Sequence, residues 1–282
     1  MKKIILAAVW LFVSSCATKS TDQNDSGTVQ DKSAANSSVE TKPVLTQEED
    51  MATKKVEKVA DSQYSRLDEA IKSQNDEAIQ LAASEILTQN AKDVRGLNAL
   101  GLLYYKKGRF EAALYLLKKA VEQNSRSAEL YGNLGVVYLA KNERREAIKS
   151  FRKALEYNAN DSLVGANLGS IYVQEKDFSK ALMALEIAVK NGMKDIKVLN
   201  NYAIALTATG RTAQAAEIYE KLLKENPSQK EVLLNYSILL IEEMQKYKEG
   251  LDLLNRLKFV GSSSDSRQII KDLENRAKAG LQ

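Results

Sequence analysis

The stretches YGNLGVVY (residues 131–138) and GANLGSIY (165–172) share the run Asn-Leu-Gly, followed three residues after the glycine by tyrosine. Two further stretches, LNNYAIAL (199–206) and LLNYSILL (233–240), keep the asparagine at the same place and relax the residues around it. The asparagines are therefore spaced by 34 residues each time, at Asn133, Asn167, Asn201 and Asn235. A strict period of this length predicts an array of similar supersecondary units.

The period extends well beyond these stretches. Segments that begin at residues 94, 128, 162 and 196 align with one another without a gap. A fifth segment begins at residue 230, and its second half fits when one extra residue is inserted before Tyr247. The insertion places Tyr247 opposite Phe110 and Phe178, and it places Gly250 at a position that is otherwise alanine. We therefore predict five units, at 94–127, 128–161, 162–195, 196–229 and 230–263.

Small and large residues recur at fixed places in these units. A Leu-Gly pair stands at Leu100 and Gly101, Leu134 and Gly135, and Leu168 and Gly169, relaxing to Tyr202 and Ala203. A small residue and a bulky partner follow, at Ala113 and Leu117, Ala147 and Phe151, Ala181 and Leu185, and Ala215 and Tyr219. This pattern resembles the tetratricopeptide repeat, a helix–turn–helix unit of the same period. The resemblance implies an all-α fold, a solenoid of antiparallel helix pairs that forms a right-handed superhelix.

Both ends of the array are predicted to be caps. Residues 61–93 form a degenerate helix pair in phase with the array, and residues 264–280 form one amphipathic helix. Such elements hide the apolar end of a solenoid. Inside the array, Gly108 and Gly210 stand where the first helix of a unit must stop, as a left-handed cap requires. Asn142 occupies the same place and adopts that conformation less easily.

The beginning of the chain has the features of an export signal. Lys2 and Lys3 precede the apolar run IILAAVWLFV (4–13), which is too short to span a bilayer and has the length of a signal-peptide core. Cys16, the only cysteine, follows in VSSC and resembles a bacterial lipobox, with Val13 where leucine is commoner. The resemblance implies a signal peptide at 1–15 and an acylated Cys16 that holds the protein to the lipid bilayer. An ordinary signal peptide with an incidental cysteine is the alternative.

The next segment, residues 16–60, is predicted to be a disordered linker. It is rich in Ser, Thr, Asn, Asp and Lys and contains no aromatic residue. It therefore cannot bury enough apolar surface to offset its ordering entropy. As a coil of roughly 44 residues it spans about 35–40 Å on average. Ala17, which follows the lipidated cysteine, implies by resemblance to enterobacterial lipoproteins an outer-membrane location facing the periplasm.

Composition argues against several classes of function. The chain has no histidine, so the commonest metal ligand and general base are missing. Its net charge of +4 is too small to argue for nucleic acid. No glycine-rich phosphate loop and no nucleophile beside a histidine is present. We therefore predict no enzyme, no metal, no cofactor and no small-molecule substrate.

The repeated asparagines are predicted to share one face of the array. Each precedes the packing residues of its helix, and one residue turns a helix by about 100°, so the asparagine faces away from the second helix of its unit. In the family this side lines the concave surface. Because an amide offers a donor and an acceptor, such a ladder could hold the backbone of an extended polypeptide. The alternative is that each asparagine bonds locally to the neighbouring repeat.

The rest of the predicted groove is aliphatic. Its floor is formed by residues that lie one and two turns beyond the asparagines, including Leu102, Tyr105, Val136, Ile204 and Ile238. The cations near it, Arg95, Lys106 and Lys197, do not converge, so no carboxylate clamp is predicted. A helix or an extended hydrophobic segment is the expected ligand.

These features together predict a membrane-anchored scaffold that binds protein or peptide segments in the groove. The chain looks similar to tetratricopeptide lipoproteins of the Gram-negative envelope, which implies a role in assembling an envelope machine and partners such as pilus secretin or gliding-motility subunits. The alternatives are a passive structural spacer and an accessory subunit of a cell-wall enzyme. Basic stretches such as NERREAIKSFRKA (142–154) are interpreted as solvated helix faces, with a binding site as the alternative.

Overall fold

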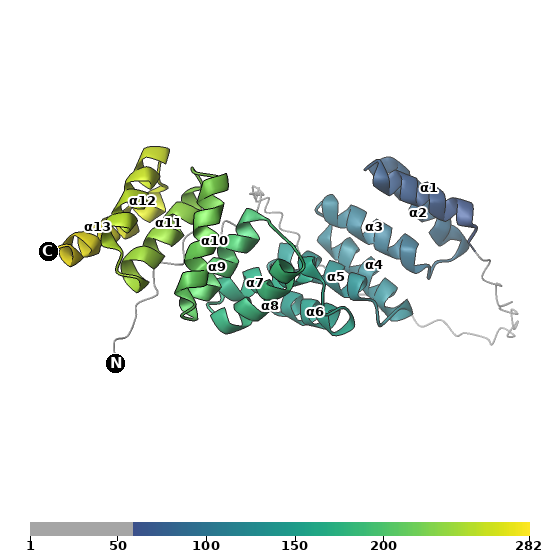
Figure 1. Ribbon diagram of the computed structural model, residues 1–282. Coiled ribbons are helices and arrows are strands. Elements are labelled where there is room, and N and C mark those ends of the chain that lie inside the picture. The colour runs from purple at the N-terminus through teal and green to yellow at the C-terminus, as the bar shows by residue number, and fades with distance from the viewer. Residues whose placement is uncertain (1–58) are drawn as a thin grey trace, which may run out of the picture.

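Antiparallel helix pairs follow one another along the chain and end in a single helix (Figure 1). The computed structural model describes residues 59–282, and within them every regular element is a helix. The predicted signal peptide, Cys16 and all of the predicted linker up to residue 58 lie outside the described residues. The helices are α1 (Asp61–Lys72), α2 (Asp76–Gln89), α3 (Val94–Lys106), α4 (Phe110–Gln123), α5 (Ala128–Ala140), α6 (Arg144–Tyr157), α7 (Ser162–Gln174), α8 (Phe178–Lys190), α9 (Ile196–Ala208), α10 (Thr212–Glu225), α11 (Lys230–Ile238), α12 (Tyr247–Val260) and α13 (Arg267–Gly280). A π-helical segment, η2 (Leu239–Glu243), continues α11, and a 3₁₀ turn, η3 (Ser264–Ser266), precedes α13.

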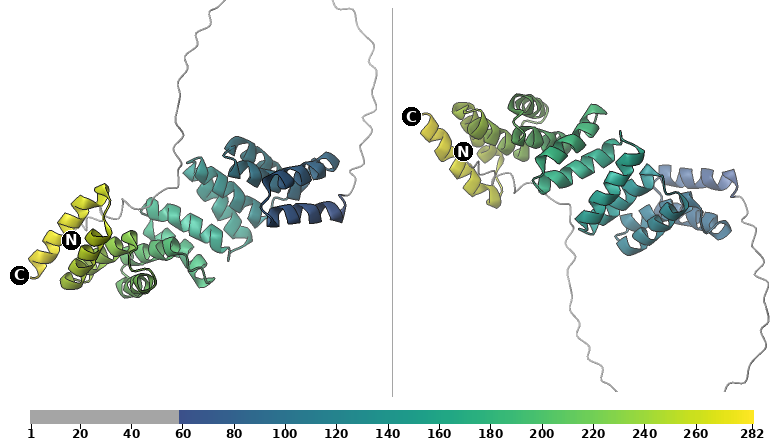
Figure 2. Two further views of the ribbon diagram at one scale, coloured as in Figure 1. Left: turned by 90° about the horizontal axis from the view of Figure 1, so that it is seen from above. Right: turned by 90° about the horizontal axis from the view of Figure 1, so that it is seen from below.

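The helices stack along one axis, with α1 at one end of the molecule and α13 at the other (Figures 1 and 2). Each helix packs mainly on the helices next to it in sequence. This arrangement confirms the predicted all-α solenoid. It also follows from the physics of the repeat, because one pair exposes an apolar face that only the next pair can cover.

A residue with positive φ ends the first helix of every pair. After η2 the amide of Lys246 donates to a carbonyl six residues back, that of Leu240, at 2.8 Å. In the other pairs the amide of the next residue donates to a carbonyl five residues back, as Arg109 does to Tyr104 at 2.8 Å. This is the hydrogen bond of a Schellman cap. Gly108 and Gly210 have φ of 71° and 80°, and Asn142 has φ of 62°, so the predicted left-handed caps are confirmed. The corresponding positions in the other pairs are Gln74, Lys176 and Gln245.

The Leu-Gly pair marks the place where the two helices of a unit touch. A methyl group on Gly135 would lie 2.5 Å from the ring of Phe151, and one on Gly169 would lie 2.4 Å from Cγ of Leu185. Both distances are too short for any real contact. Glycine at this place therefore lets the bulky side chain of the second helix lie directly against the backbone of the first.

The fifth pair contains the predicted extra residue. In the preceding four units the second helix starts 16 residues after the first, whereas α12 starts 17 residues after α11. The extra residue is absorbed by η2, where the amide of Met244 donates to the carbonyl of Leu239 at 3.0 Å. A single π-helical turn is the usual way to add one residue inside a helix. As a result Tyr247 begins α12 just as Phe110 begins α4, which confirms the inserted alignment.

Replacing Gln245 with glycine is expected to raise the free energy of unfolding by about 0.5–1 kcal/mol, because glycine adopts positive φ without the steric cost that a Cβ brings. Gln245 has φ of 55° and an exposed side chain. Urea unfolding followed by circular dichroism measures the change. Gly210→Ala at the equivalent turn is the matched control and should lower the free energy by a similar amount. A shift of both variants in the same direction would contradict the backbone explanation.

The hydrophobic core runs the length of the solenoid. One cluster of buried residues extends from Ala113 to Ala277, a second joins Val59 and α1 to α3, and a small cluster around Leu97 and Leu130 lies between them. The clusters draw buried residues from every helix, α1 to α13, so residues 59–282 have a hydrophobic core of their own, as a part of a chain that folds by itself must have.

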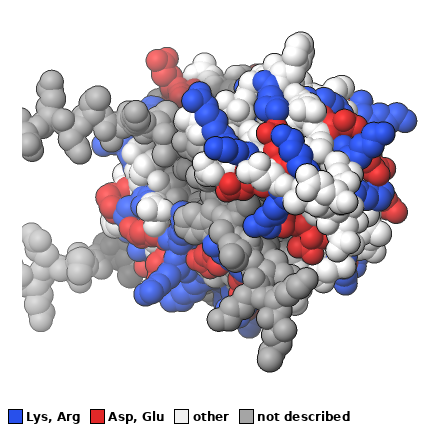
Figure 3. Space-filling view, turned by 90° about the vertical axis from the view of Figure 1, so that its left-hand side faces the viewer, with Lys and Arg blue, Asp and Glu red and all other residues white. Residues whose placement is uncertain are grey.

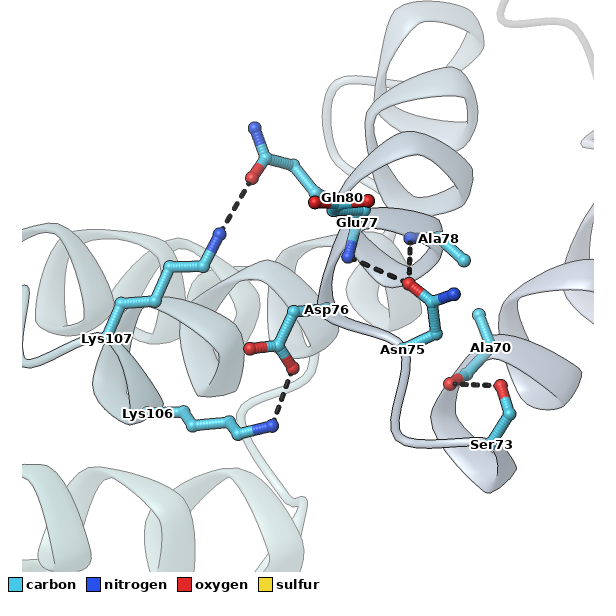
Figure 4. Close-up of polar contacts among 9 residues, drawn as sticks. All are labelled: Ala70, Ser73, Asn75, Asp76, Glu77, Ala78, Gln80, Lys106 and Lys107. Atoms are coloured by element: carbon cyan, nitrogen blue, oxygen red, sulfur yellow. Dashed lines mark hydrogen bonds and ion pairs between the residues drawn. The ribbon is translucent and has the colours of Figure 1, made fainter.

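The first helix pair is joined to the array by polar contacts as well as by its core (Figure 4). Lys106 pairs with Asp76 at 2.6 Å, and Lys107 donates to Gln80 at 3.1 Å. The hydroxyl of Tyr64 donates to Asp93, and this hydrogen bond, with burial as a second cause, raises the pKa of Tyr64 to about 12. The exposed ion pair stabilises little, whereas the bond to Asp93 links α1 to the residue that caps α3.

The other end of the array is closed by α13. It buries Ile270, Leu273 and Ala277 against the preceding elements and exposes polar residues such as Lys271 and Asp272. Figure 3 views this end of the molecule and shows basic and acidic side chains interspersed on it. The helix therefore covers the apolar end of the last pair with a polar surface, as a solenoid cap must.

Candidate protein-binding surface

The first helices of the units (α3, α5, α7, α9 and α11) form the inner side of the solenoid. Side-chain hydrogen bonds join α3 to α5, α7 to α9 and α9 to α11 directly. Among residues 59–282, no such bond joins consecutive second helices from α4 to α12. The first helices therefore approach one another more closely, which places them on the inside of the curve. We call the surface that they share the inner face.

Three of the four repeated asparagines bond to the preceding unit. The side-chain amide of Asn133 donates to Asn98 at 2.8 Å, and that of Asn235 donates to Asn200 at 3.1 Å. Asn201 donates to the hydroxyl of Ser170 at 3.1 Å. The structure thus shows, for these three, the local bonding that the sequence left open as an alternative. They connect units and hold them in register.

Burial increases along the ladder. Asn133 is half-buried, whereas Asn201 and Asn235 are buried. Replacing Asn235 with alanine would leave the carbonyl oxygen of Asn200 buried without its donor, which costs about 1–3 kcal/mol. The C-terminal asparagines are therefore primarily structural.

Asn167 differs from the other three. Its side chain is half-buried on α7 and has no hydrogen-bond partner among the residues that the structure describes. At the equivalent place in the next unit, Asn201 reaches back to Ser170, but the unit before Asn167 offers Val136 instead of a polar group. Asn167 therefore presents both its donor and its acceptor at the inner face.

The predicted groove floor divides into two parts. Leu102, Tyr105 and Val136 are half-buried and remain accessible on α3 and α5. Ile204 and Ile238 are 6% and 8% exposed, so they are packed into the core and offer almost no surface to a ligand. The accessible part of the inner face is consequently its N-terminal half.

The reason lies in α11, in which every residue from Val232 to Ile238 is buried. A helix that is apolar around its whole circumference is buried on all sides. The run VLLNYSILLI (232–241) already indicates this burial, because it contains no charged residue.

Leu163 is a member of this surface that the repeat pattern did not single out. It lies four residues before Asn167, so the two side chains point within about 40° of each other on α7. It is 69% exposed, although it is a large aliphatic residue. The signal is visible in the alignment: Arg95, Glu129 and Lys197 occupy the same place in other units, and only this unit between 94 and 229 has an apolar residue there.

The cations around the inner face are mostly neutralised by neighbours. Arg95 pairs with Asp68 at 2.5 Å, and Lys106 pairs with Asp76. Lys197 is exposed and has no ion pair within the described part of the chain. The charges therefore do not converge on one point, and the accessible surface is apolar with one open amide.

Neither a metal-binding cluster nor a membrane-spanning helix is present in the described residues. Residues 59–282 contain no group of three or more His, Cys, Asp or Glu side chains that could hold a metal ion. Among them, no helix combines the length and the apolar composition that crossing a bilayer requires.

Family models of the tetratricopeptide repeat match three stretches of the chain. A model described as TPR repeat matches residues 101–142, and models described as tetratricopeptide repeat match residues 128–161 and 166–230. No curated protein resembles the chain closely enough in sequence to count as a relative.

Solved structures of similar fold include several tetratricopeptide proteins. YrrB, described as a TPR protein with an unusual peptide-binding site, is 21% identical with a TM-score of 0.62 over 70% of this chain and 98% of its own. PilF of Pseudomonas aeruginosa is 24% identical with a TM-score of 0.51, over 66% of this chain and 88% of its own. A tetratricopeptide repeat protein of Parabacteroides merdae is 15% identical with a TM-score of 0.54, over 79% and 91%.

At these identities the structural likeness concerns the fold alone. The family models and the stacked helix pairs nevertheless agree on the repeat class and on its phase. Tetratricopeptide repeats bind protein or peptide partners, so the chain has the architecture of a protein-interaction scaffold. It contains tetratricopeptide repeats, which the family models match over residues 101–161 and 166–230.

Proposed function

We propose that the protein is a membrane-anchored scaffold that binds partner polypeptides on the N-terminal half of its inner face. The observation that carries the proposal is the pairing of an unpartnered amide, Asn167, with an exposed leucine, Leu163, one turn away on α7. The other repeated asparagines form hydrogen bonds between units, so Asn167 is the one whose amide remains free to bind a ligand.

The chemistry of this surface fits a polypeptide. An amide side chain can donate to a backbone carbonyl and accept from a backbone N–H at once, whatever the partner's sequence. Leu163 and the half-buried Leu102 and Val136 offer apolar contacts on either side. The expected ligand is an amphipathic helix or an extended segment whose apolar side chains cover these residues.

The cellular part of the proposal is supported by the sequence before residue 59. The lipobox-like VSSC ending at Cys16 supports an acyl anchor, and the polar linker supports a solenoid held at a distance from the bilayer. Within the Gram-negative envelope, most simply at the periplasmic side of the outer membrane, such a protein would assist assembly of a larger machine such as a pilus secretin or a gliding-motility complex.

A passive spacer is the second candidate, and one observation favours it. The hydrogen bonds of Asn133, Asn201 and Asn235 stiffen the array and consume most of the amides that a ligand would need. A spacer has no specific ligand on its inner face, so the two candidates differ in what a change at that face does.

The double variant Leu163→Ser and Asn167→Ala tests the inner face. We expect it to weaken capture of envelope proteins by the full chain at least about fivefold, since it removes an apolar contact and an amide worth together roughly 1–3 kcal/mol. Chemical cross-linking in envelope membranes, followed by quantitative mass spectrometry, measures the loss. Replacing all four asparagines is a poorer test, because three of them support the fold.

Leu81→Ser is the matched control, because Leu81 on α2 is 64% exposed and lies away from α7. This control should retain the full set of cross-linked partners. If the double variant and the control both retain it, the inner face is not the binding surface and the spacer is the better description.

A further inference from the structure

The outer face of α6 carries an unusual stripe of positive charge. Arg145, Lys149 and Arg152 follow one another at intervals of four and three residues, and all three are exposed. This spacing places them on one side of the helix. The opposite side buries Ala147 and Phe151 in the core, so the stripe points straight away from the inner face.

The three cations have no ion pair within residues 59–282, unlike many of the charges around them. Lys153 on the same helix pairs with Glu156 at 2.6 Å, and Lys141 pairs with Glu111 and Glu143. Glu146 is the other carboxylate of α6, and it forms no ion pair with them. Like charges at this spacing repel and mildly destabilise the helix, so the arrangement is one that an outside anion would relieve.

The stripe is specific to this unit. The equivalent residues of α10 are Ala213, Glu217 and Glu220, and those of α8 are Ser179, Met183 and Glu186. A merely solvated outer face would not need a different charge pattern in one helix. The cations are thus a local property of α6 and not of the repeat.

The neighbouring outer helices extend the charge and add two exposed apolar groups. Lys118 on α4 is exposed, whereas Lys180 on α8 is paired with Asp177 at 2.5 Å. Tyr115 and Met183 occupy the position of Lys149 in the units before and after, and they are 58% and 70% exposed. We call the surface formed by Lys118, Arg145, Lys149 and Arg152 with Tyr115 and Met183 the outer basic patch.

We propose that the outer basic patch rests on an anionic lipid bilayer. The proposal rests on the anchoring part of the proposed function, because the lipid on Cys16 and the linker would bring the solenoid to within about 40 Å of such a surface. Basic residues bind the negative surface of a membrane, and tyrosine and methionine beside them enter the interface between headgroups and acyl chains. An acidic protein would also pair with these charges, but the anchor and linker of the same chain bring a bilayer, and not such a protein, to the patch.

The proposed orientation has a direct consequence for the binding surface. The patch lies on second helices and the inner face on first helices, so they are on opposite sides of the solenoid. When the patch lies on the bilayer, Leu163 and Asn167 face away from it, toward the compartment in which partners diffuse. The patch would therefore present the inner face instead of hiding it.

Vesicle binding of residues 59–282 tests the patch without the lipid anchor. We expect this fragment to sediment with vesicles that contain 30% phosphatidylglycerol and not with pure phosphatidylcholine, and to be released by 0.5 M salt, which reduces the screening length to about 4 Å. The triple variant Arg145→Glu, Lys149→Glu and Arg152→Glu should bind at least about 100-fold more weakly, at roughly fivefold for each cation. Replacing the same three residues with glutamine should also weaken vesicle binding. This milder variant shows whether the loss persists without the charge reversal that could make the first variant misfold.

The matched control is Lys221→Glu, Lys224→Glu and Lys271→Glu, which changes the net charge equally at exposed residues elsewhere. It should keep vesicle binding to within about threefold. No binding by the unaltered fragment, equal binding to both kinds of vesicle, or an equal loss in the control would each overturn the proposal. Because the fragment lacks Cys16, these outcomes are independent of whether the chain is acylated.

Discussion

Replacing Phe151 with alanine is expected to lower the free energy of unfolding by about 3–5 kcal/mol. The side chain is fully buried, and its ring lies directly against the backbone of Gly135 in the first helix of the same unit. Removing it deletes apolar contacts and leaves a cavity between two helices that the surrounding units hold in place. Urea unfolding followed by circular dichroism measures the loss.

The position of Phe151 in the array should also make the unfolding less cooperative. In a solenoid each unit is stabilised mainly by its neighbours, so a weak unit in the middle separates the two ends. We expect the variant to show a broader transition than the unaltered protein. Phe259→Ala makes the same chemical change at a side chain that is 95% exposed, and it should alter the free energy by less than about 0.5 kcal/mol. Equal effects of the two changes would refute the packing argument.

Replacing Cys16 with serine is expected to move the protein from the membrane to the soluble fraction of the envelope. Serine cannot carry the thioether that the lipobox resemblance implies, and no helix in residues 59–282 is long and apolar enough to cross a bilayer. Several acyl chains bind a membrane durably, so the unaltered protein should remain there through a high-salt wash.

Fractionation after a 0.5 M salt wash measures this outcome and separates it from the patch. Salt removes electrostatic binding by the outer basic patch but not an acyl anchor. Incorporation of labelled palmitate into the unaltered chain, and its absence from the variant, provides a second readout. Salt-resistant membrane association of the serine variant would rule out acylation of Cys16 as the anchor.

Much of the fold could be predicted from the repeat itself. One sequence was enough to predict the start of each unit, the left-handed turns at Gly108 and Gly210, and the extra residue before Tyr247. These features depend on contacts inside one unit or between units that share the same pattern. Five copies of that pattern act as independent tests of one alignment, which is why a single inserted residue could be placed.

The state of individual side chains on the inner face could not be predicted in the same way. Asn133, Asn167, Asn201 and Asn235 occupy one repeat position, yet three bond to a neighbouring unit and one does not. Ile204 was expected to line the groove and is buried, whereas Leu163, which the repeat pattern did not single out, is exposed.

The chain's periodicity was therefore sufficient to establish the helix pairs, their stacking order and the positions where helices must touch. Whether the side-chain amide of an asparagine is hydrogen-bonded depends on which atom of another unit, 31–35 residues away, lies within about 3 Å of it. That distance is set by the packing of all side chains between the helices. Periodicity gives the direction in which a side chain points, and only the folded array shows what it meets there.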